Sequence, residues 1–556
     1  MSSKIKFLFM LIACMLTQAV FAQDTLTPTC YRISLTDKNN NPYSIENPSA
    51  YLSDRAIAKR TRFMIPITEQ DLPVNPQYIQ QICQLDANIR VLCTSKWMNT
   101  VTVYCPDSLK LPQIQQLSFV SEILPVANYD VNGWTTRNAV PEVEETPIVC
   151  NALRDSVVPY DYGYAYEQIA IHNGHFLHNL GFRGDSMLIV VFDAGWEGVD
   201  TSAFFGTMFQ NGQVWGTRDL IPWRNNVYEG HYHGTLVTST MSGLQESVMV
   251  GTAPRANYYF IRSEEPDHEE LIEEDFWAQA AEIADSLGAD VINSSLGYTS
   301  FADFPECQYT YENTDGVTSI ASRAATILGQ KGVVVCVSAG NDGNNAWHHI
   351  GHPADAFDVL SVGAADIFGN SAGFSSRGPS YDGRVKPDIT SVGVSTTCMW
   401  PGDYLGTADG TSLAGPVAAG LCACLWQALP NATSLELMQI VRESGSCYDN
   451  PNDSLGYGIP DFLSAYMQHV SVTDYIVENV EVFPNPCTDF LKITNASTEI
   501  SMIEIYSSDG KLMQTFTPAN DLFVNLDVHD LPTGFYVGKV YKADKQSGFF
   551  KFVKKQ

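Results

Sequence analysis

Positive charge is scarce in this sequence. Its 556 residues include 32 Lys and Arg against 62 Asp and Glu, which gives a net charge of −30 at pH 7. Such a chain repels phosphate backbones and anionic membrane surfaces, so nucleic acid is excluded as an expected partner. Charged residues make up 17% of the chain and hydrophobic residues 45%, a balance that also excludes bulk disorder.

Long hydrophobic runs are missing beyond the first residues. Lys4 and Lys6 precede an apolar run, and Val20-Phe21-Ala22 has the small or apolar residues found before a signal-peptidase cut. We therefore predict a signal peptide over residues 1–22. A lipoprotein cleavage box at Leu11-Ile12-Ala13-Cys14 is disfavoured, because apolar residues continue well past it. No later stretch reaches the roughly 18 apolar residues that span a bilayer, so no transmembrane segment is expected after signal removal.

Metal-binding patterns are also lacking. Of the 13 cysteines, Cys14 lies in the predicted signal, and the others follow neither zinc nor dense disulfide spacing. His348, His349 and His352 have no acidic or Cys partner at a helical spacing, which favours a structural role. The acidic cluster over residues 264–275 lacks EF-hand spacing and is interpreted as a solvated helix face. We predict no metal site and no required cofactor, and leave a structural calcium open.

The length predicts about three or four folded units. The acidity is confined to the middle, since residues 151–465 carry 12 basic and 38 acidic side chains, whereas residues 24–150 carry 10 and 13. We divide the chain into a signal (1–22), a propeptide-like domain and linker (23–150), a catalytic domain (151–465) and a C-terminal domain (478–556). The negative electrostatic potential of residues 151–465 is expected to favour cationic substrates.

The sequence of the propeptide-like segment, residues 23–150, predicts a small α+β unit. Apolar residues alternate on both sides of Asn99, which indicates a hairpin. Together with two helices and a further strand, the hairpin indicates a unit of βαββαβ type, whose first strand is not located. The expected elements are strands near 89–93, 101–105 and 119–126 and helices near 76–85 and 109–117.

The middle segment, residues 151–465, has a different pattern of hydrophobic residues. It contains short, continuous, β-branched runs, which are typical of strands buried on both faces. Helical stretches near 269–286 and 316–330 separate some of them, and this alternation predicts a parallel sheet with helices on both faces. The expected strands are 187–192, 258–261, 290–293, 333–337 and 359–362. Residues 478–556 show only short alternating runs, which predict a small antiparallel β-sandwich.

Three residues of the middle segment combine into one chemistry. Asp193 directly follows a predicted strand, His233 begins a helix-like stretch, and Ser412 opens an apolar helix. A serine hydroxyl is a poor nucleophile and needs a base, and the base needs an acid to hold its tautomer. At the start of a helix, the positive dipole end is expected to disfavour protonation of His233, so that it is available as a base.

An oxyanion site is expected beside them. The backbone N–H of Ser412 lies at a helix N-terminus, where donors point outward. The side-chain amide of Asn341, just after the predicted strand 333–337, is the candidate second donor.

Four motifs in this order resemble the subtilisin-like serine proteases (subtilases, peptidase family S8) over about residues 165–465. They are Asp193-Ala194-Gly195, His233-Gly234-Thr235, Ser338-Ala339-Gly340-Asn341 and Gly410-Thr411-Ser412-Leu413-Ala414. The resemblance implies an Asp-His-Ser triad, an acyl-enzyme intermediate and a subtilisin-like α/β fold.

The resemblance also implies a substrate site. Ser295, Leu296 and Gly297 would form the backbone edge that pairs with a substrate peptide, and Ala339 with Gly340 would wall the specificity pocket on the opposite side. Pairing of an extended peptide with a free edge gives affinity through main-chain bonds.

Some positions depart from the family pattern. The family usually has Ser or Thr at Ala194, Ser at Gly415 and often His at Val417, and we interpret these changes as tuning. His231 lies two residues before His233 but is not followed by Gly-Thr, which favours a role at the rim.

The flanking segments also resemble known ones. The first matches the propeptides of exported subtilases in size and position, with a permanent binding domain as the alternative. The C-terminal segment resembles the sorting domain of type IX secretion substrates. The resemblance rests on Val482-Phe483-Pro484-Asn485-Pro486, on the stretch from Leu531 to Tyr536 and on the basic C-terminal end. That implies the outer-membrane secretion machinery as a partner and a secreted or cell-surface location, and a carbohydrate-binding sandwich is the alternative.

The sequence thus predicts a secreted serine endopeptidase acting on proteins or peptides. A catalytically inactive surface binding protein of the same fold is the first rival. The second is an acid-acting sedolisin-type enzyme, which uses Glu where this chain has His233.

Overall fold

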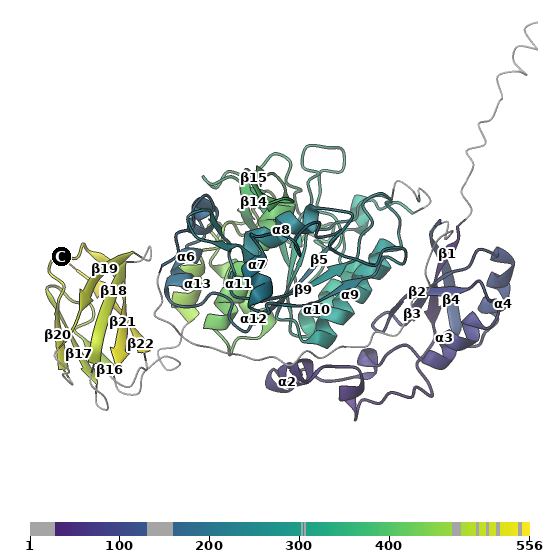
Figure 1. Cartoon of the computed structure of the whole chain (residues 1–556), viewed down its shortest axis with the longest axis horizontal. Coiled ribbons are helices and arrows are strands. Elements are labelled where there is room, and N and C mark those ends of the chain that lie inside the picture. Colours follow the sequence, from purple (N-terminus) through teal and green to yellow (C-terminus); the bar gives the residue numbers. More distant parts are fainter. Residues whose placement is uncertain are drawn as a thin grey trace, which may run out of the picture.

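The computed structural model describes most of the chain in three folded units (Figure 1). The described residues are 28–129, 159–301, 304, 307–469, 480–495, 500–507, 511–518, 523–542 and 547–555. The predicted signal peptide and the boundaries predicted at residues 150 and 478 lie outside them.

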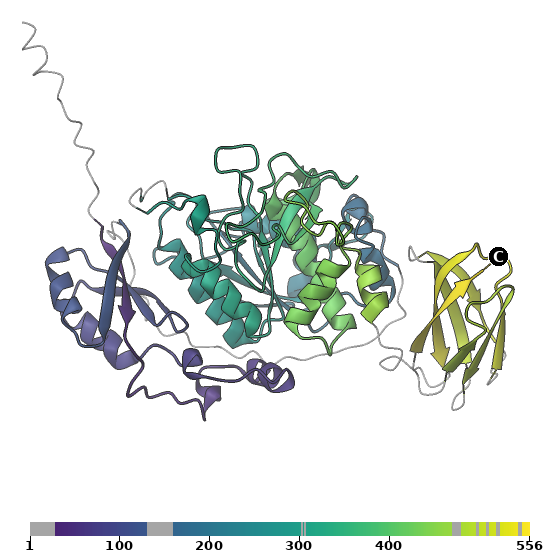
Figure 2. The same cartoon turned by 180° about the vertical axis from the view of Figure 1, so that it is seen from behind.

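The N-terminal domain has one antiparallel sheet in the order β2-β3-β1-β4. Two helices cover it, so the βαββαβ order matches the sequence prediction. The elements are β1 (Cys30–Leu35), α3 (Pro76–Cys83), β2 (Arg90–Ser95), β3 (Thr100–Tyr104), α4 (Leu111–Gln115) and β4 (Val120–Ala127). The sequence analysis missed α2 (Asp54–Arg62), which lies apart from this sheet and beneath the central domain (Figures 1 and 2).

The central domain contains a seven-stranded parallel sheet in the order β13-β12-β11-β10-β5-β9-β6. The strands are β5 (Leu188–Asp193), β6 (Val214–Asp219), β9 (Asn257–Arg262), β10 (Val291–Ser294), β11 (Val334–Ser338), β12 (Leu360–Ala365) and β13 (Ile389–Val392). All five predicted strands are present, and the two missed strands, β6 and β13, are the edges.

Helices cover both faces of this sheet. On one face α8 (His233–Ser242) and α11 (Thr411–Ala428) pack against the odd-numbered residues of β5. On the other, α9 (Glu273–Leu287) and α10 (Ile320–Gln330) pack against the even-numbered ones. The smaller elements are α5 (Tyr166–Ala170), α6 (Gly174–Asn179), α7 (Gly206–Gln210), α12 (Ser434–Glu443), α13 (Phe462–His469), and two hairpins, β7 (Leu244–Gln245) with β8 (Met249–Val250) and β14 (Thr396–Trp400) with β15 (Tyr404–Ala408).

The C-terminal domain consists of two antiparallel sheets that share one hydrophobic core, as predicted for a β-sandwich. One sheet has the order β16-β17-β20 and the other β19-β18-β21-β22. The strands are β16 (Val480–Phe483), β17 (Phe490–Asn495), β18 (Ile500–Ser507), β19 (Leu512–Phe516), β20 (Phe523–Asp527), β21 (Gly534–Lys542) and β22 (Ser547–Lys554). In the described part of the chain, no helix combines the length and hydrophobicity needed to cross a membrane.

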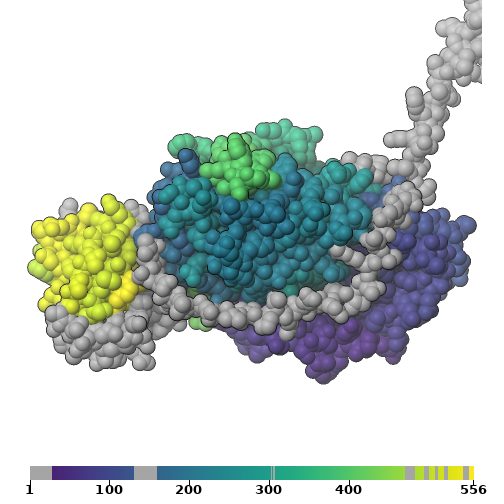
Figure 3. Space-filling view, in the orientation of Figure 1, coloured from purple at the N-terminus to yellow at the C-terminus, as the bar shows by residue number. Residues whose placement is uncertain are grey.

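The N-terminal domain packs directly on α9 of the central domain through β2 and α2. Figure 3 shows this domain, in purple, against the central domain. Arg32 of β1 donates two hydrogen bonds to Asp275, at 2.7 and 2.6 Å. Glu282 accepts from the Ser95 hydroxyl at 2.6 Å and from the Lys96 backbone at 2.8 Å. The expectation of a solvated acidic helix face is therefore wrong for α9, because basic and hydrogen-bonding groups of another domain cover it.

A second contact lies beneath the central domain. Arg60 of α2 is 2% exposed and donates to Asp285 at 2.7 Å and to Asp71 at 3.2 Å. Asp71 also pairs with Lys331 of the central domain at 2.8 Å. The segment around α2 thus fastens the N-terminal domain to the end of α9 through buried ion pairs.

Candidate active site

The predicted acid and base lie in direct contact. Asp193 ends β5 and is fully buried, and His233 is the first residue of α8. Nδ1 of His233 lies 2.9 Å from Oδ1 and 3.0 Å from Oδ2 of Asp193. A proton on Nδ1 is donated to the carboxylate, which leaves Nε2 as the free acceptor.

Burial disfavours the charged imidazolium, but the charge and hydrogen bond of Asp193 outweigh it, so the pKa of His233 is raised. The net shift is therefore opposite in direction to the one expected from the helix start alone. A carboxylate at hydrogen-bond distance has a larger effect than the partial charge of a helix end.

Ser412 is the second residue of α11 and is 9% exposed. The helix begins after Gly410, whose φ of +152° few other residues adopt and where a Cβ atom would stand 2.9 Å from Oγ of Ser412. Leu236 of α8 and Leu413 of α11 share a small hydrophobic cluster, which holds the two helix N-termini together. In the described residues no hydrogen bond joins His233 to Ser412.

Asn341 is anchored beside this turn. Its Oδ1 accepts from the backbone N–H of Thr411 at 2.9 Å and from the Thr411 hydroxyl at 3.0 Å. These bonds fix the amide orientation and leave Nδ2 as a free donor among the described residues. A Cβ atom on Gly410 would lie near both Nδ2 of Asn341 and Oγ of Ser412, so the two groups flank the same point. The N–H of Ser412, in the first turn of α11, likewise has no described acceptor.

The predicted substrate edge has unused backbone groups. In the described part of the chain, the backbone groups of Leu296 and Gly297 form no hydrogen bond. Ser295 is fixed below them, because its hydroxyl donates to the Ser412 carbonyl at 2.9 Å. By contrast, Ala339 donates to Val362 at 3.0 Å and the Gly340 N–H to the Thr411 hydroxyl at 3.3 Å. The first segment is open to an added peptide, whereas the second is bound to the domain.

The position of Gly415 explains one departure from the family pattern. A Cβ atom there would lie 3.1 Å from Oγ of Ser338 and 3.2 Å from Oδ1 of Asn293. A serine at this position would require both side chains to shift, so glycine fits the packing below Ser412.

His352 is buried and lies 3.0 Å from Asp355, three residues further along the chain, so the expectation that the histidines of residues 348–352 lack an acidic partner at a helical spacing is wrong. The pKa of His231 is lowered by burial and by the neighbouring His233. Within the described residues, no group of three or more His, Cys, Asp and Glu side chains is placed to hold a metal ion. The 11 cysteines of this part of the chain are free thiols.

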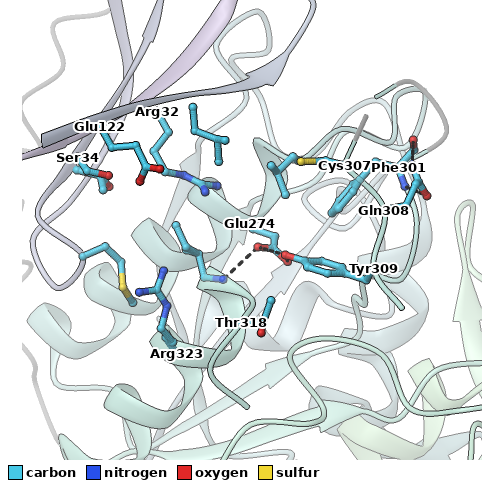
Figure 4. Close-up of a pocket in the computed structure, with 15 residues that line it drawn as sticks. Arg32, Ser34, Glu122, Glu274, Phe301, Cys307, Gln308, Tyr309, Thr318 and Arg323 are labelled. Carbon is cyan, nitrogen blue, oxygen red and sulfur yellow. Dashed lines mark hydrogen bonds between the residues drawn. The ribbon is translucent and has the colours of Figure 1, made fainter. Parts of the chain in front are cut away.

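The sequence analysis did not predict a cavity of about 470 Å³ between the N-terminal and central domains (Figure 4). Arg32, Glu122 and Glu274 line it together with Tyr309 and Arg323. Glu274 accepts from the Tyr309 hydroxyl at 2.9 Å and from the Ile320 backbone at 3.1 Å. None of the predicted site residues lines this cavity.

Comparisons with known proteins identify the three units. Residues 211–458 match the model of the subtilase family, residues 30–142 that of the peptidase S8 propeptide domain of Bacteroidota, and residues 481–555 that of the secretion system C-terminal sorting domain. The first match includes His233 and Ser412 but begins after Asp193.

Curated relatives agree with the subtilase assignment. Subtilisin E of Bacillus subtilis (strain 168) is 27% identical over 319 residues, which cover 56% of this chain and 74% of subtilisin E. Subtilisin BL of Lederbergia lenta is 28% identical over 276 residues, covering 50% and 89%. The solved MycP3 protease from the type VII (ESX-3) secretion system aligns with a TM-score of 0.43 at 20% identity, covering 56% of this chain and 89% of that one.

The central domain of the chain matches the subtilase family, and the flanking domains match an S8 propeptide domain and a secretion sorting domain. The protein is therefore a subtilisin-like serine endopeptidase that is secreted or located at the cell surface.

Proposed function

We propose that the protein hydrolyses peptide bonds through Asp193, His233 and Ser412, with a covalent acyl-enzyme intermediate. The observation that carries this proposal is the Asp193–His233 hydrogen bond, at 2.9 Å, beside a serine in the first turn of a helix. This arrangement supplies an acid, a base and a nucleophile in the roles that peptide hydrolysis needs.

In the first step, Oγ of Ser412 attacks the peptide carbonyl and Nε2 of His233 takes its proton. The hydrogen bond that this transfer needs forms on substrate binding, as catalytic contacts commonly tighten in the substrate complex. Asp193 holds the ring and stabilises the imidazolium. The N–H of Ser412 and Nδ2 of Asn341 donate to the oxyanion, where the charge develops.

In the second step, His233 returns the proton to the leaving amine and the peptide bond breaks. Water then attacks the acyl-enzyme, again with His233 as the base, and releases Ser412. The substrate backbone pairs with residues 295–297, and Ala339 and Gly340 wall the pocket for its side chain. No step requires a cofactor.

The flanking domains have separate proposed roles. The N-terminal domain covers α9 until this domain is cut away. The C-terminal domain is recognised by the outer-membrane secretion machinery. N-terminal sequencing of the secreted form tests both the cut site and the predicted boundary near residue 150.

An active-site serine phosphonate tests the central proposal. We expect one adduct on Ser412 in the processed protein and none in Ser412→Ala, whose peptidase activity is also lost. An unlabelled Ser412, with equal behaviour of both proteins, would identify an inactive binding protein. Activity that peaks well below pH 5 would instead favour a sedolisin-type mechanism.

A further inference from the structure

Several buried polar atoms of the central domain form no hydrogen bond within the described residues. Three of them, Oε2 of Glu264, Oε2 of Glu273 and the hydroxyl of Tyr298, belong to one region of the domain. Glu273 is 0% and Tyr298 1% exposed. An unsatisfied buried polar group lowers the stability of the folded state, so three such groups in one region call for an explanation.

These groups form one cluster although they come from three elements. Glu264 follows β9, Glu273 begins α9, and Tyr298 follows β10. Burial, followed by the charges of Glu264 and Glu273, raises the pKa of Tyr298. Burial and the charge of Glu264 likewise raise the pKa of Glu273. Oε1 of Glu273 also accepts from the backbone N–H of Glu265, the residue after Glu264, at 3.0 Å, so the carboxyl groups of Glu264 and Glu273 come from neighbouring positions in space.

The cluster lies beside the proposed catalytic site. Strand β9 pairs with β5 so that Arg262 stands opposite Asp193, and the next N–H, of Ser263, donates to the Asp193 carbonyl at 3.2 Å. Glu264 is the following residue. On the other side, Tyr298 directly follows Gly297 of the proposed substrate edge.

A peptide segment already reaches this place. At the end of β4, the N–H of Ile272 donates to the Val126 carbonyl at 3.1 Å, and just beyond the strand the N–H of Asn128 donates to Glu270 at 2.7 Å. Tyr129 has a raised pKa because of burial and then the charge of Glu273. The end of the N-terminal domain thus extends across the loop that leads into α9, which demonstrates room for a peptide.

We propose that Glu264, Glu273 and Tyr298 form a subsite for a Lys or Arg side chain of the substrate. This inference rests on the proposed endopeptidase function and adds a substrate class to it. A cationic group donates to both carboxylates and to the phenol oxygen, which gives each orphaned oxygen a charge-assisted bond. It also offsets the repulsion between the two carboxylates, which burial makes costly.

Peptide cleavage by the processed wild-type protein tests the subsite. Lys, norleucine or Glu is placed singly at each position around the cleaved bond, and kcat/KM is measured for each peptide. At one position we expect kcat/KM for the Lys peptide to exceed that for the norleucine peptide by about tenfold, the effect of one or two charge-assisted hydrogen bonds. The Glu peptide should have the lowest kcat/KM at that position. Cleavage with no preference for Lys or Arg at any position would overturn the subsite but not the endopeptidase function.

Variants assign the preference to the cluster. In Glu264→Gln and Glu273→Gln the Lys-to-norleucine ratio is expected to fall toward one, and Tyr298→Phe is expected to lower it less. Asp267→Asn removes the same charge from an exposed position on the same loop and is expected to keep the ratio. Phosphonate labelling of Ser412 counts the folded active sites in each variant. An unchanged ratio in both Gln variants would exclude the cluster, whereas absent labelling of the wild type would reject the proposed function itself.

Discussion

Among single residues, His233 determines the pH range of the proposed reaction. It acts as a base only when neutral, and the adjacent carboxylate raises its pKa above the usual value of about 6.5. We expect kcat/KM to fall as the pH decreases through this raised pKa. Asp193→Asn should move the midpoint to lower pH and reduce kcat by about 10⁴-fold.

The pH dependence of kcat/KM for both proteins measures this effect. His529→Gln changes an exposed histidine of the C-terminal domain and should leave the midpoint in place. A midpoint that does not move in Asp193→Asn would contradict the role given to Asp193.

Asn341 should act on the transition state and not on substrate binding. Asn341→Ala is expected to lower kcat by about 100- to 1000-fold with little change in KM, because the proposed role of the lost donor is to bind the developing oxyanion. Asn344→Ala, an exposed amide of the same loop, is the matched control. Steady-state kinetics distinguish the two variants, and a change confined to KM would argue against an oxyanion role.

Among the elements, the start of α11 depends on one glycine. In Gly410→Ala the new methyl group would stand 2.9 Å from Oγ of Ser412, at a φ of +152° that alanine rarely adopts. Strain of about 1–3 kcal/mol would displace the nucleophile, and we expect slower phosphonate labelling and a lower kcat. Gly206→Ala, where no crowding exists, should label at the wild-type rate.

The buried charges of α2 should stabilise the docked precursor. Arg60→Ala leaves Asp71 and Asp285 with fewer partners, and removal of one member of a buried ion network typically costs about 3–5 kcal/mol. Introduced into the Ser412→Ala protein, which is not expected to process itself, the change should lower the midpoint of denaturant unfolding. Arg62→Ala alters an exposed residue of the same helix and should have little effect. Equal unfolding midpoints for the two variants would contradict a stabilising role of the buried ion pairs of Arg60.

The elements also show what a sequence can reveal. Strands buried on both faces were predictable because their β-branched runs are continuous. The edge strands β6 and β13 were missed because polar residues such as Thr217 and Ser391 interrupt their apolar runs. The proposed triad was found because each member lies in a local motif. Glu264, Glu273 and Tyr298 were not, since their meaning depends on burial by segments far away in the chain.

On the scale of the whole molecule, the C-terminal domain is separable in function. It has its own core and meets the central domain near α13, where Lys551 donates to the Met467 carbonyl. Deletion of residues 478–556 should keep kcat/KM within about twofold while the protein stays inside the cell. Activity assays and cell fractionation measure the two effects. Export of the truncated chain would contradict a sorting role.

The ion pairs along α9 have a practical consequence for purification. While the N-terminal domain is in place, Arg32 and Lys96 neutralise Asp275 and Asp285. Its departure returns these carboxylates, together with Glu282, to water, and leaves a middle segment with 12 basic and 38 acidic side chains. Maturation should therefore be visible on an anion-exchange column. Removal of residues 24–150 takes away 10 basic and 13 acidic side chains, which by itself would slightly weaken retention. Because carboxylates of α9 become exposed, we expect the processed enzyme to be retained more strongly than this change in net charge predicts.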